Sequence, residues 1–146
     1  MERDAPYIEA LVEILSAEIS DDEDAELRDR VMNALVKSGG RAVPPLIKAL
    51  FHRDGEVRRC AVEILYRVSE TDKDAVHQAH PELTSLLNDA DVITRSLAAF
   101  VLYRADPSQR DVVTPVLDKA LNDGRNERDI VPFMIAAEAL KEIGAP

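Results

Sequence analysis

One spacing recurs along this chain: an Asp followed by a Leu eleven positions later. The four copies run from Asp24 to Leu35, Asp54 to Leu65, Asp91 to Leu102 and Asp129 to Leu140, so that successive aspartates are 30, 37 and 38 residues apart. A repeat of this length is typical of a stacked array, in which each unit buries its apolar face only against its neighbours. The chain is therefore expected to form one repeat domain over residues 1–146.

Each copy has the pattern of an amphipathic helix. In the second copy, Val57, Ala61, Ile64 and Leu65 follow the i, i+4, i+7, i+8 spacing of one helical face. The opening Asp suits the N-cap position, where its carboxylate can accept hydrogen bonds from unpaired backbone N–H groups. We therefore predict four helices that each begin at an Asp.

A second apolar helix precedes each of these, and each contains a proline: Pro6, Pro44, Pro81 and Pro115. Proline fits the first turn of a helix, where its missing N–H breaks no hydrogen bond. The chain is thus predicted to be all-α, an α-solenoid of about four antiparallel helix pairs. The expected pairs are 6–20 with 24–38, 42–52 with 55–69, 75–88 with 91–104, and 110–122 with 127–143.

The second pair carries a family resemblance. Its segments Arg-Ala-Val-Pro-Pro-Leu-Ile-Lys-Ala-Leu (41–50) and Asp-Gly-Glu-Val-Arg-Arg-Cys-Ala (54–61) closely resemble the HEAT repeat of the phycobilisome-lyase-like type. The resemblance implies a right-handed, armadillo-like solenoid whose second helices line a concave, partner-binding surface. It also admits enzymes, because HEAT-like folds include chromophore lyases and a DNA glycosylase class. The fourth repeat is expected to be degenerate, since Pro132 and Phe133 stand where the second has Val57 and Arg58.

Charge and hydropathy restrict the partners. The formal charge is −10, from 28 acidic and 18 basic residues, so the average field repels nucleic acid and anionic lipid. No apolar run reaches the roughly 18 residues of a membrane span, and the first residues do not resemble a signal peptide. We expect a cytoplasmic protein that binds neither nucleic acid nor membrane.

The sequence lacks a recognisable catalytic or metal motif, so neither an enzymatic activity nor a cofactor is predicted. Cys60 is the single cysteine and is interpreted as a small core residue. His77 and His80 could share a helix face beside a zinc ion, but no third ligand accompanies them, and surface histidines are the favoured interpretation. The acidic run 21–24 lacks the ligand spacing of a calcium loop and is interpreted as a solvated helix start.

A repeated Leu-Tyr-Arg tripeptide supplies the candidate binding surface. It occurs at residues 65–67 and again at 102–104, at the same position of two repeats. Tyr and Arg are enriched at binding hot spots, which predicts a strip that contacts a protein partner. The acidic rims expected around it favour a partner of basic character. Alternatively, the tyrosines fill the seam between repeats and the arginines complement helix dipoles. The candidate partner-binding residues are Arg59, Tyr66, Arg67, Phe100, Tyr103 and Arg104.

Phe100 is singled out because its counterpart in the second repeat is Glu63, a residue typical of solvent. Either the third helix is rotated or Phe100 is an exposed anchor. The pairs Asp24/Arg28, Asp54/Arg58 and Asp91/Arg95 are interpreted as structural ion pairs, within a repeat or between repeats.

The C-terminal edge suggests a further alternative. Ala137, Ala139, Leu140 and Ile143 are predicted to leave an apolar edge that a homodimer or a docked partner covers. In that case the chain would be a structural subunit completed by self-association.

Overall fold

The computed structural model describes residues 5–17, 25–124 and 130–144, and in these segments the chain is helical without a strand. The α-helices are α1 (Ala5–Ala17), α2 (Ala25–Ser38), α3 (Val43–Ala49), α4 (Gly55–Thr71), α5 (Lys73–Val76), α6 (His80–Leu86), α7 (Val92–Ala105), α8 (Arg110–Gly124) and α9 (Val131–Ile143). Short 3-10 turns, η3 (Gly39–Ala42), η4 (His77–Ala79) and η5 (Pro107–Gln109), precede α3, α6 and α8.

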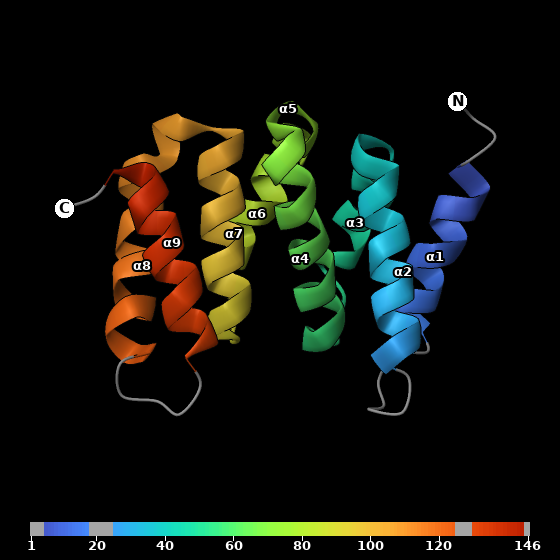
Figure 1. Ribbon diagram of the computed structural model, residues 1–146, viewed down its shortest axis with the longest axis horizontal. Coiled ribbons are helices and arrows are strands. Elements are labelled where there is room, and N and C mark those ends of the chain that lie inside the picture. The colour runs from blue at the N-terminus through green and yellow to red at the C-terminus, as the bar shows by residue number, and fades with distance from the viewer. Residues whose placement is uncertain (1–4, 18–24, 125–129, 145–146) are drawn as a thin grey trace.

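The helices form two layers. Figure 1 shows the second helices of the pairs, α2, α4, α7 and α9, side by side across the front, and the two ends of the chain at opposite ends of the array. The first helices α3 and α6 lie behind them. The predicted all-α solenoid of helix pairs is confirmed. None of the described helices is long and apolar enough to cross a membrane.

The positions that recur in the sequence form the centre of the core. Leu35, Leu65 and Leu102 are fully buried, and Leu140 is 8% exposed. Small residues at equivalent places, such as Ala61, Ala98 and Ala136, are also fully buried. Small side chains allow neighbouring helices to approach closely, so the repeat pattern marks where the pairs stack.

Two of the predicted aspartate caps are formed. Asp54 accepts a hydrogen bond from the Glu56 N–H (3.0 Å), and Asp91 accepts one from the Thr94 N–H (3.0 Å). Each carboxylate satisfies a backbone donor that has no partner within its helix. The fourth helix does not begin at its Asp as predicted, because the N-cap of α9 is Ile130, which makes no side-chain cap hydrogen bond. The side chains of Asp24 and Asp129 and the acidic run 21–24 lie outside the described residues.

Proline changes two of the predicted first helices. One helix was expected over 75–88, but α5 and α6 are separated by the turn η4, because Pro81 lacks an N–H and its ring would clash with a preceding carbonyl. Pro81 instead opens α6, as Pro44 opens α3. In the fourth pair the expectation of a leading proline is wrong, since Pro115 lies inside α8.

An arginine in the first turn of the second helix ties each central pair together. The Arg58 guanidinium donates to the carbonyl oxygens of His52 (2.7 Å) and Arg53 (3.1 Å), just beyond α3. Arg95 donates in the same way to the carbonyls of Asp89 (2.7 Å) and Ala90 (3.0 Å), beyond α6. These carbonyls belong to the turns between the helices and lie outside any helical hydrogen-bond ladder, so one side chain fixes the turn between the two helices of a pair.

Arg58 also reaches the next repeat, where its Nε lies 2.7 Å from an Asp89 carboxylate oxygen. The predicted ion pair between Asp54 and Arg58 is therefore replaced by a pair between repeats. For Arg95 the observed partners are the backbone carbonyls beyond α6 rather than Asp91. A pair of Arg28 with Asp24 falls outside the described residues.

Candidate functional site

A groove of about 610 Å³ runs between α2 and α4 on the face formed by the second helices. Its lining comprises Arg28, Asp29, Met32 and Asn33 from α2, and Glu56, Arg59, Cys60, Glu63, Tyr66, Arg67 and Glu70 from α4. Met32 and Cys60 are 5% and 7% exposed and form an apolar floor, whereas most of the other lining residues are charged. Burial raises the pKa of the Cys60 thiol to about 11, so this cysteine is neutral at physiological pH.

The end of the groove at the start of α4 is closed by ion pairs. Arg59 lies 3.3 Å from a Glu56 carboxylate oxygen and 3.2 Å from an Asp91 oxygen of the next repeat. Arg28 approaches Glu56 from α2 at 4.0 Å. Burial raises the pKa of Asp91, but hydrogen bonds from Thr94 and the charge of Arg59 outweigh it, and the net effect lowers the pKa. Arg59 therefore lines the groove while it serves a structural contact.

At the other end of the groove Arg67 is exposed, and among the described residues it makes one hydrogen bond, from Nη1 to the Asn33 side-chain oxygen across the groove (3.1 Å). A guanidinium has five N–H donors, and this contact uses one of them. Arg67 can thus donate hydrogen bonds to a bound molecule while it keeps its bond to Asn33.

Tyr66 forms the boundary between the groove and a cluster that fills the next repeat. Its ring lies 5.2 Å from the ring of Phe100, and the Arg104 guanidinium stacks 4.1 Å from the centre of the Phe100 ring and 4.9 Å from that of Tyr66. Burial raises the pKa of Tyr66, and the nearby Arg104 charge opposes this rise. The cluster thus combines Tyr66 of the second repeat with Phe100 and Arg104 of the third repeat.

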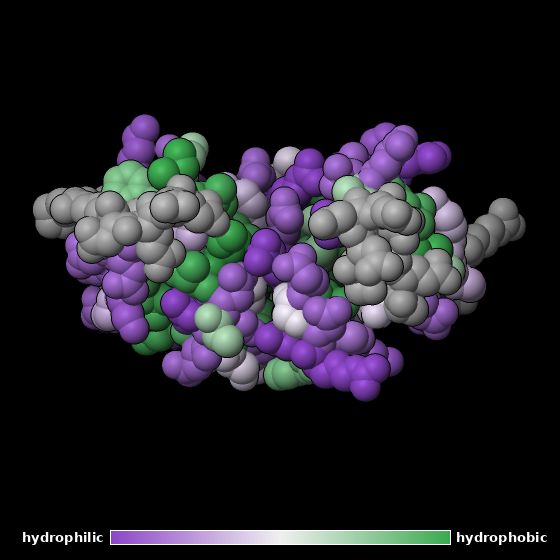
Figure 2. Space-filling view, turned by 90° about the horizontal axis from the view of Figure 1, so that it is seen from below, coloured by the Kyte–Doolittle hydropathy of each residue, from purple (hydrophilic) through white to green (hydrophobic). Residues whose placement is uncertain are grey.

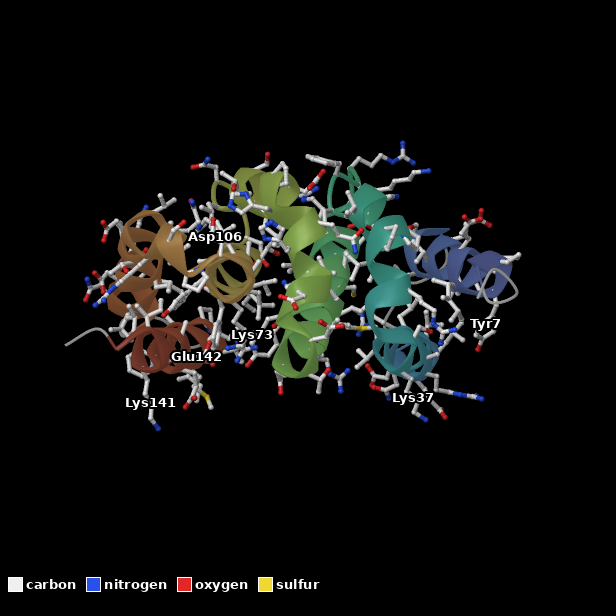
Figure 3. All side chains as sticks on the ribbon, turned by 90° about the horizontal axis from the view of Figure 1, so that it is seen from above. Tyr7, Lys37, Lys73, Asp106, Lys141 and Glu142 are labelled. Atoms are coloured by element: carbon white, nitrogen blue, oxygen red, sulfur yellow. The ribbon has the colours of Figure 1, made fainter. Side chains whose placement is uncertain are left out.

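Arg104, on α7, is held by two neighbouring helices. It makes two hydrogen bonds to the Glu142 carboxylate of α9 (2.9 and 3.0 Å) and one to the Ser69 hydroxyl of α4 (3.0 Å). Figure 3 shows Glu142 on the side of α9 near α7, while Lys141 points away from the array. We call Tyr66, Phe100, Arg104, Ser69 and Glu142 the arginine clamp; it fills the second-helix face between α4 and α9.

The clamp corrects part of the predicted binding strip. Phe100 is 2% exposed and is no surface anchor; it is apolar, unlike Glu63, because α4, α9 and the Arg104 guanidinium cover this position. The Arg104 side chain is 9% exposed, and three of its N–H groups donate internally to Glu142 and Ser69. Tyr103 packs against the core and does not line the groove. Arg59, Tyr66 and Arg67 remain together at the groove.

Several groove residues were missed from the sequence, chiefly those of α2 and the acidic residues of α4. A signal for the latter exists, since Glu56, Glu63 and Glu70 repeat every seven residues. Two helical turns separate such residues, which places them on one face. No comparable signal relates Asp29 or Asn33 to α4.

The two histidines make structural contacts at the end of α6. His80 Nε2 lies 3.2 Å from an Asp106 oxygen, and His77 Nδ1 lies 3.2 Å from the Ala105 carbonyl oxygen. Asp106 also accepts hydrogen bonds from Ser108, which lower its pKa. Within the described parts of the chain, the side chains of His, Cys, Asp and Glu form no group of three or more that could hold a metal ion.

A hollow of about 790 Å³ lies between α1 and α3, in the layer of first helices. Apolar side chains such as Val12, Pro44 and Ala49 line it, with Glu9 and Glu13 on α1 and Lys48 on α3. This hollow could not be predicted from the sequence, because its two walls belong to different repeats.

The predicted apolar C-terminal edge is wrong for three of its four residues. Ala137 is partly exposed, but Ala139, Leu140 and Ile143 are buried, since they face the preceding helices rather than the end of the array. The exposed apolar residues of this region are Ile130 (60%), Val131 (45%) and Met134 (55%), at the start of α9. Figure 2 shows hydrophobic side chains at the surface of the C-terminal half when the array is viewed from below.

Stacked helix pairs, aspartate caps and a repeated arginine that ties each central pair together define an α-solenoid with an open groove on its second-helix face. The sequence model of the family described as HEAT repeats matches residues 8–102, and the chain belongs to this family. The match ends at Leu102, the last residue of the Asp-to-Leu interval of the third repeat. Among curated proteins no relative matches the chain.

Proposed function

We propose that this HEAT-repeat protein is a non-catalytic binding module that holds a protein partner in the groove between α2 and α4. The observation that carries the proposal is the contrast between neighbouring repeats. Between α4 and α9 the arginine clamp fills the second-helix face, whereas between α2 and α4 a space of about 610 Å³ stays open. HEAT repeats commonly mediate protein–protein interactions, which agrees with this use of the surface.

The composition of the groove favours binding over catalysis. Arg59 is engaged with Glu56 and Asp91, and the Cys60 thiol is kept protonated by burial, so neither is poised for proton transfer or nucleophilic attack. The acidic balance of the chain disfavours nucleic acid as the ligand. The lyase and glycosylase alternatives have no comparable support.

The experiment is to capture the partner from the native host, purify it and measure its affinity for defined variants. Arg67→Ala removes a groove side chain that is exposed and makes one hydrogen bond, so the fold is expected to persist. Glu138→Ala is the matched control, because Glu138 is exposed on α9, away from the groove. We expect about tenfold weaker binding of Arg67→Ala, equivalent to about 1.4 kcal/mol, and no change for the control. A partner that binds both variants like the wild type would place the interface elsewhere.

Self-association is a second candidate function, favoured by the exposed apolar residues Ile130, Val131 and Met134. Apolar residues that cluster at the surface often mark a contact with another chain. Light scattering over a range of concentrations, on the wild type and on Met134→Glu, tests it. A dimer that Met134→Glu dissociates would support self-association, and a monomer at high concentration would contradict it.

A further inference from the structure

The groove between α2 and α4 also indicates the chemistry of its partner, an inference that rests on the proposed function. Three carboxylates on its walls, those of Asp29, Glu63 and Glu70, make no hydrogen bond or ion pair within the described residues. Asp29 and Glu70 are exposed and Glu63 is partly buried. The charge of Glu70 acts at longer range and raises the pKa of Arg104, but no short hydrogen bond or ion pair within the described residues holds any of the three carboxylates, so each can pair with a ligand.

Two of the three arginines that line the groove, unlike these carboxylates, already approach a charged partner. Arg28 and Arg59 both approach Glu56, and Arg59 also pairs with Asp91. Among these arginines, Arg67 has no carboxylate partner in the described parts of the chain, and it donates to the neutral Asn33 side chain. The charges left for a ligand are therefore three negative and one positive, which complements a basic partner and opposes an acidic one.

The floor adds a second requirement. Met32 and Cys60 are buried beneath the charged walls and present sulfur and carbon to the groove. Lys and Arg side chains match such a surface, because their aliphatic stems can lie on apolar atoms while the charged ends reach the carboxylates above. A compact inorganic cation would leave this floor uncovered.

The spacing of the carboxylates defines a register. Glu63 and Glu70 are seven residues apart on α4, about 10.5 Å along the helix axis at 1.5 Å per residue. In a polyproline II segment, side chains three residues apart point in the same direction and are separated by about 9.3 Å. Two basic residues spaced by three in an extended segment would therefore meet Glu63 and Glu70 together.

We infer that the groove between α2 and α4 binds an extended basic segment of a protein, with two Lys or Arg side chains three residues apart. One charged end pairs with Glu63, opposite Asp29, and the other pairs with Glu70. The remaining N–H groups of Arg67 donate to backbone carbonyl oxygens of the segment. The exposed edge of Tyr66 borders the same path.

Fluorescence anisotropy with labelled synthetic peptides tests this inference on the full chain. The probes are a (Lys-Ala-Pro) repeat, the same repeat with Glu in place of Lys, and a peptide of the first composition with its lysines contiguous. We expect the spaced lysine peptide to bind more tightly than the contiguous one, and the Glu peptide not to bind. Binding should weaken with added salt, as expected for partly exposed ion pairs.

Glu63→Gln and Glu70→Gln remove one charge each without changing the shape of the side chain, and Glu138→Gln on α9 is the matched control. Each groove variant should weaken binding of the spaced lysine peptide about tenfold, with the control unchanged and the circular dichroism of all three like the wild type. Equal binding of all three probes, or equal loss in the control, would overturn the inference. If the purified partner depends on Arg67 but not on Glu63 and Glu70, the basic-segment inference fails while the proposed function stands. If neither the peptides nor a partner depend on the groove, both fail.

Discussion

Replacing Arg104 by Ala is predicted to cause a large loss of stability, because this side chain holds three helices together. The guanidinium makes three hydrogen bonds, two to Glu142 and one to Ser69, and it covers the rings of Phe100 and Tyr66. Truncation removes these contacts together and exposes Phe100, which is 2% exposed in the intact protein. The variant therefore loses the side chain that links α7 to both α4 and α9.

The expected magnitude follows from these contacts. The guanidinium of Arg104 stacks on two aromatic rings, and because the side chain is only 9% exposed, these cation–π contacts contribute about 1 to 2 kcal/mol. The carboxylate of Glu142 is on a side chain 39% exposed, so its pair is discounted to about 1 kcal/mol. With the Ser69 hydrogen bond, at about 1 kcal/mol, the free energy of unfolding should fall by about 3 kcal/mol. For a chain of this size, that corresponds to roughly 10 °C in Tm.

Urea denaturation followed by circular dichroism measures this change. Glu142→Gln is the companion variant; it keeps the shape of the side chain and removes only the charge, so the expected loss is about 1 kcal/mol. The double variant then shows whether the two residues are coupled. A loss below about 1 kcal/mol for Arg104→Ala would refute the view that the arginine clamp stabilises the C-terminal half of the array.

Three further predictions concern single residues. Gly144 ends α9 with φ +80°, a conformation that costs most other residues about 1 to 2 kcal/mol. In urea denaturation, Gly144→Ala should therefore lower the free energy of unfolding by about that amount, and Gly144→Asn by less, because Asn tolerates this conformation better. The pKa of the Cys60 thiol is raised to about 11, so the thiol should react slowly with a thiol reagent in the native state. Burial favours the neutral thiol, so the stability that this residue contributes should be lost as the pH rises from about 9 towards 11. If the wild type and Cys60→Ala show the same dependence of stability on pH over that range, the burial argument is contradicted. Because the pKa of Asp91 is lowered, its ionised form contributes stability that is complete above about pH 4 and is lost as the pH falls through the native pKa, and Asp91→Asn should flatten the acid side of a plot of stability against pH.

The sequence predicted the scaffold well, because the signals that define it are local or strictly repeated. The Asp-to-Leu spacing located the buried leucines and alanines, and the aspartate caps of α4 and α7 follow from residues two or three positions apart. The interruption between α5 and α6, just before Pro81, was not predicted, although the missing N–H and the ring of proline explain it.

The candidate site was predicted only in part, because side chains of different repeats determine it. Phe100 was expected to be either an exposed anchor or a sign of a rotated helix, yet it is covered by Tyr66 from the repeat before and by Arg104, which Glu142 of the repeat after holds in place. A single repeat contains none of this information. The same reason explains why Asp29 and Asn33 of α2 were not associated with the groove.

The uneven strength of the contacts between repeats has a consequence for motion. The second and third repeats are joined by the ion pairs of Arg58 with Asp89 and of Arg59 with Asp91, whereas the first and second are joined on this face by a 4.0 Å contact from Arg28 and by the exposed Arg67. In a linear array the free energy of displacing a unit depends on its neighbour contacts alone. On this face, widening the groove between α2 and α4 would therefore break weaker polar contacts than separating α4 from α7, so a ligand that needs a wider groove would meet less resistance here than anywhere between the second and third repeats.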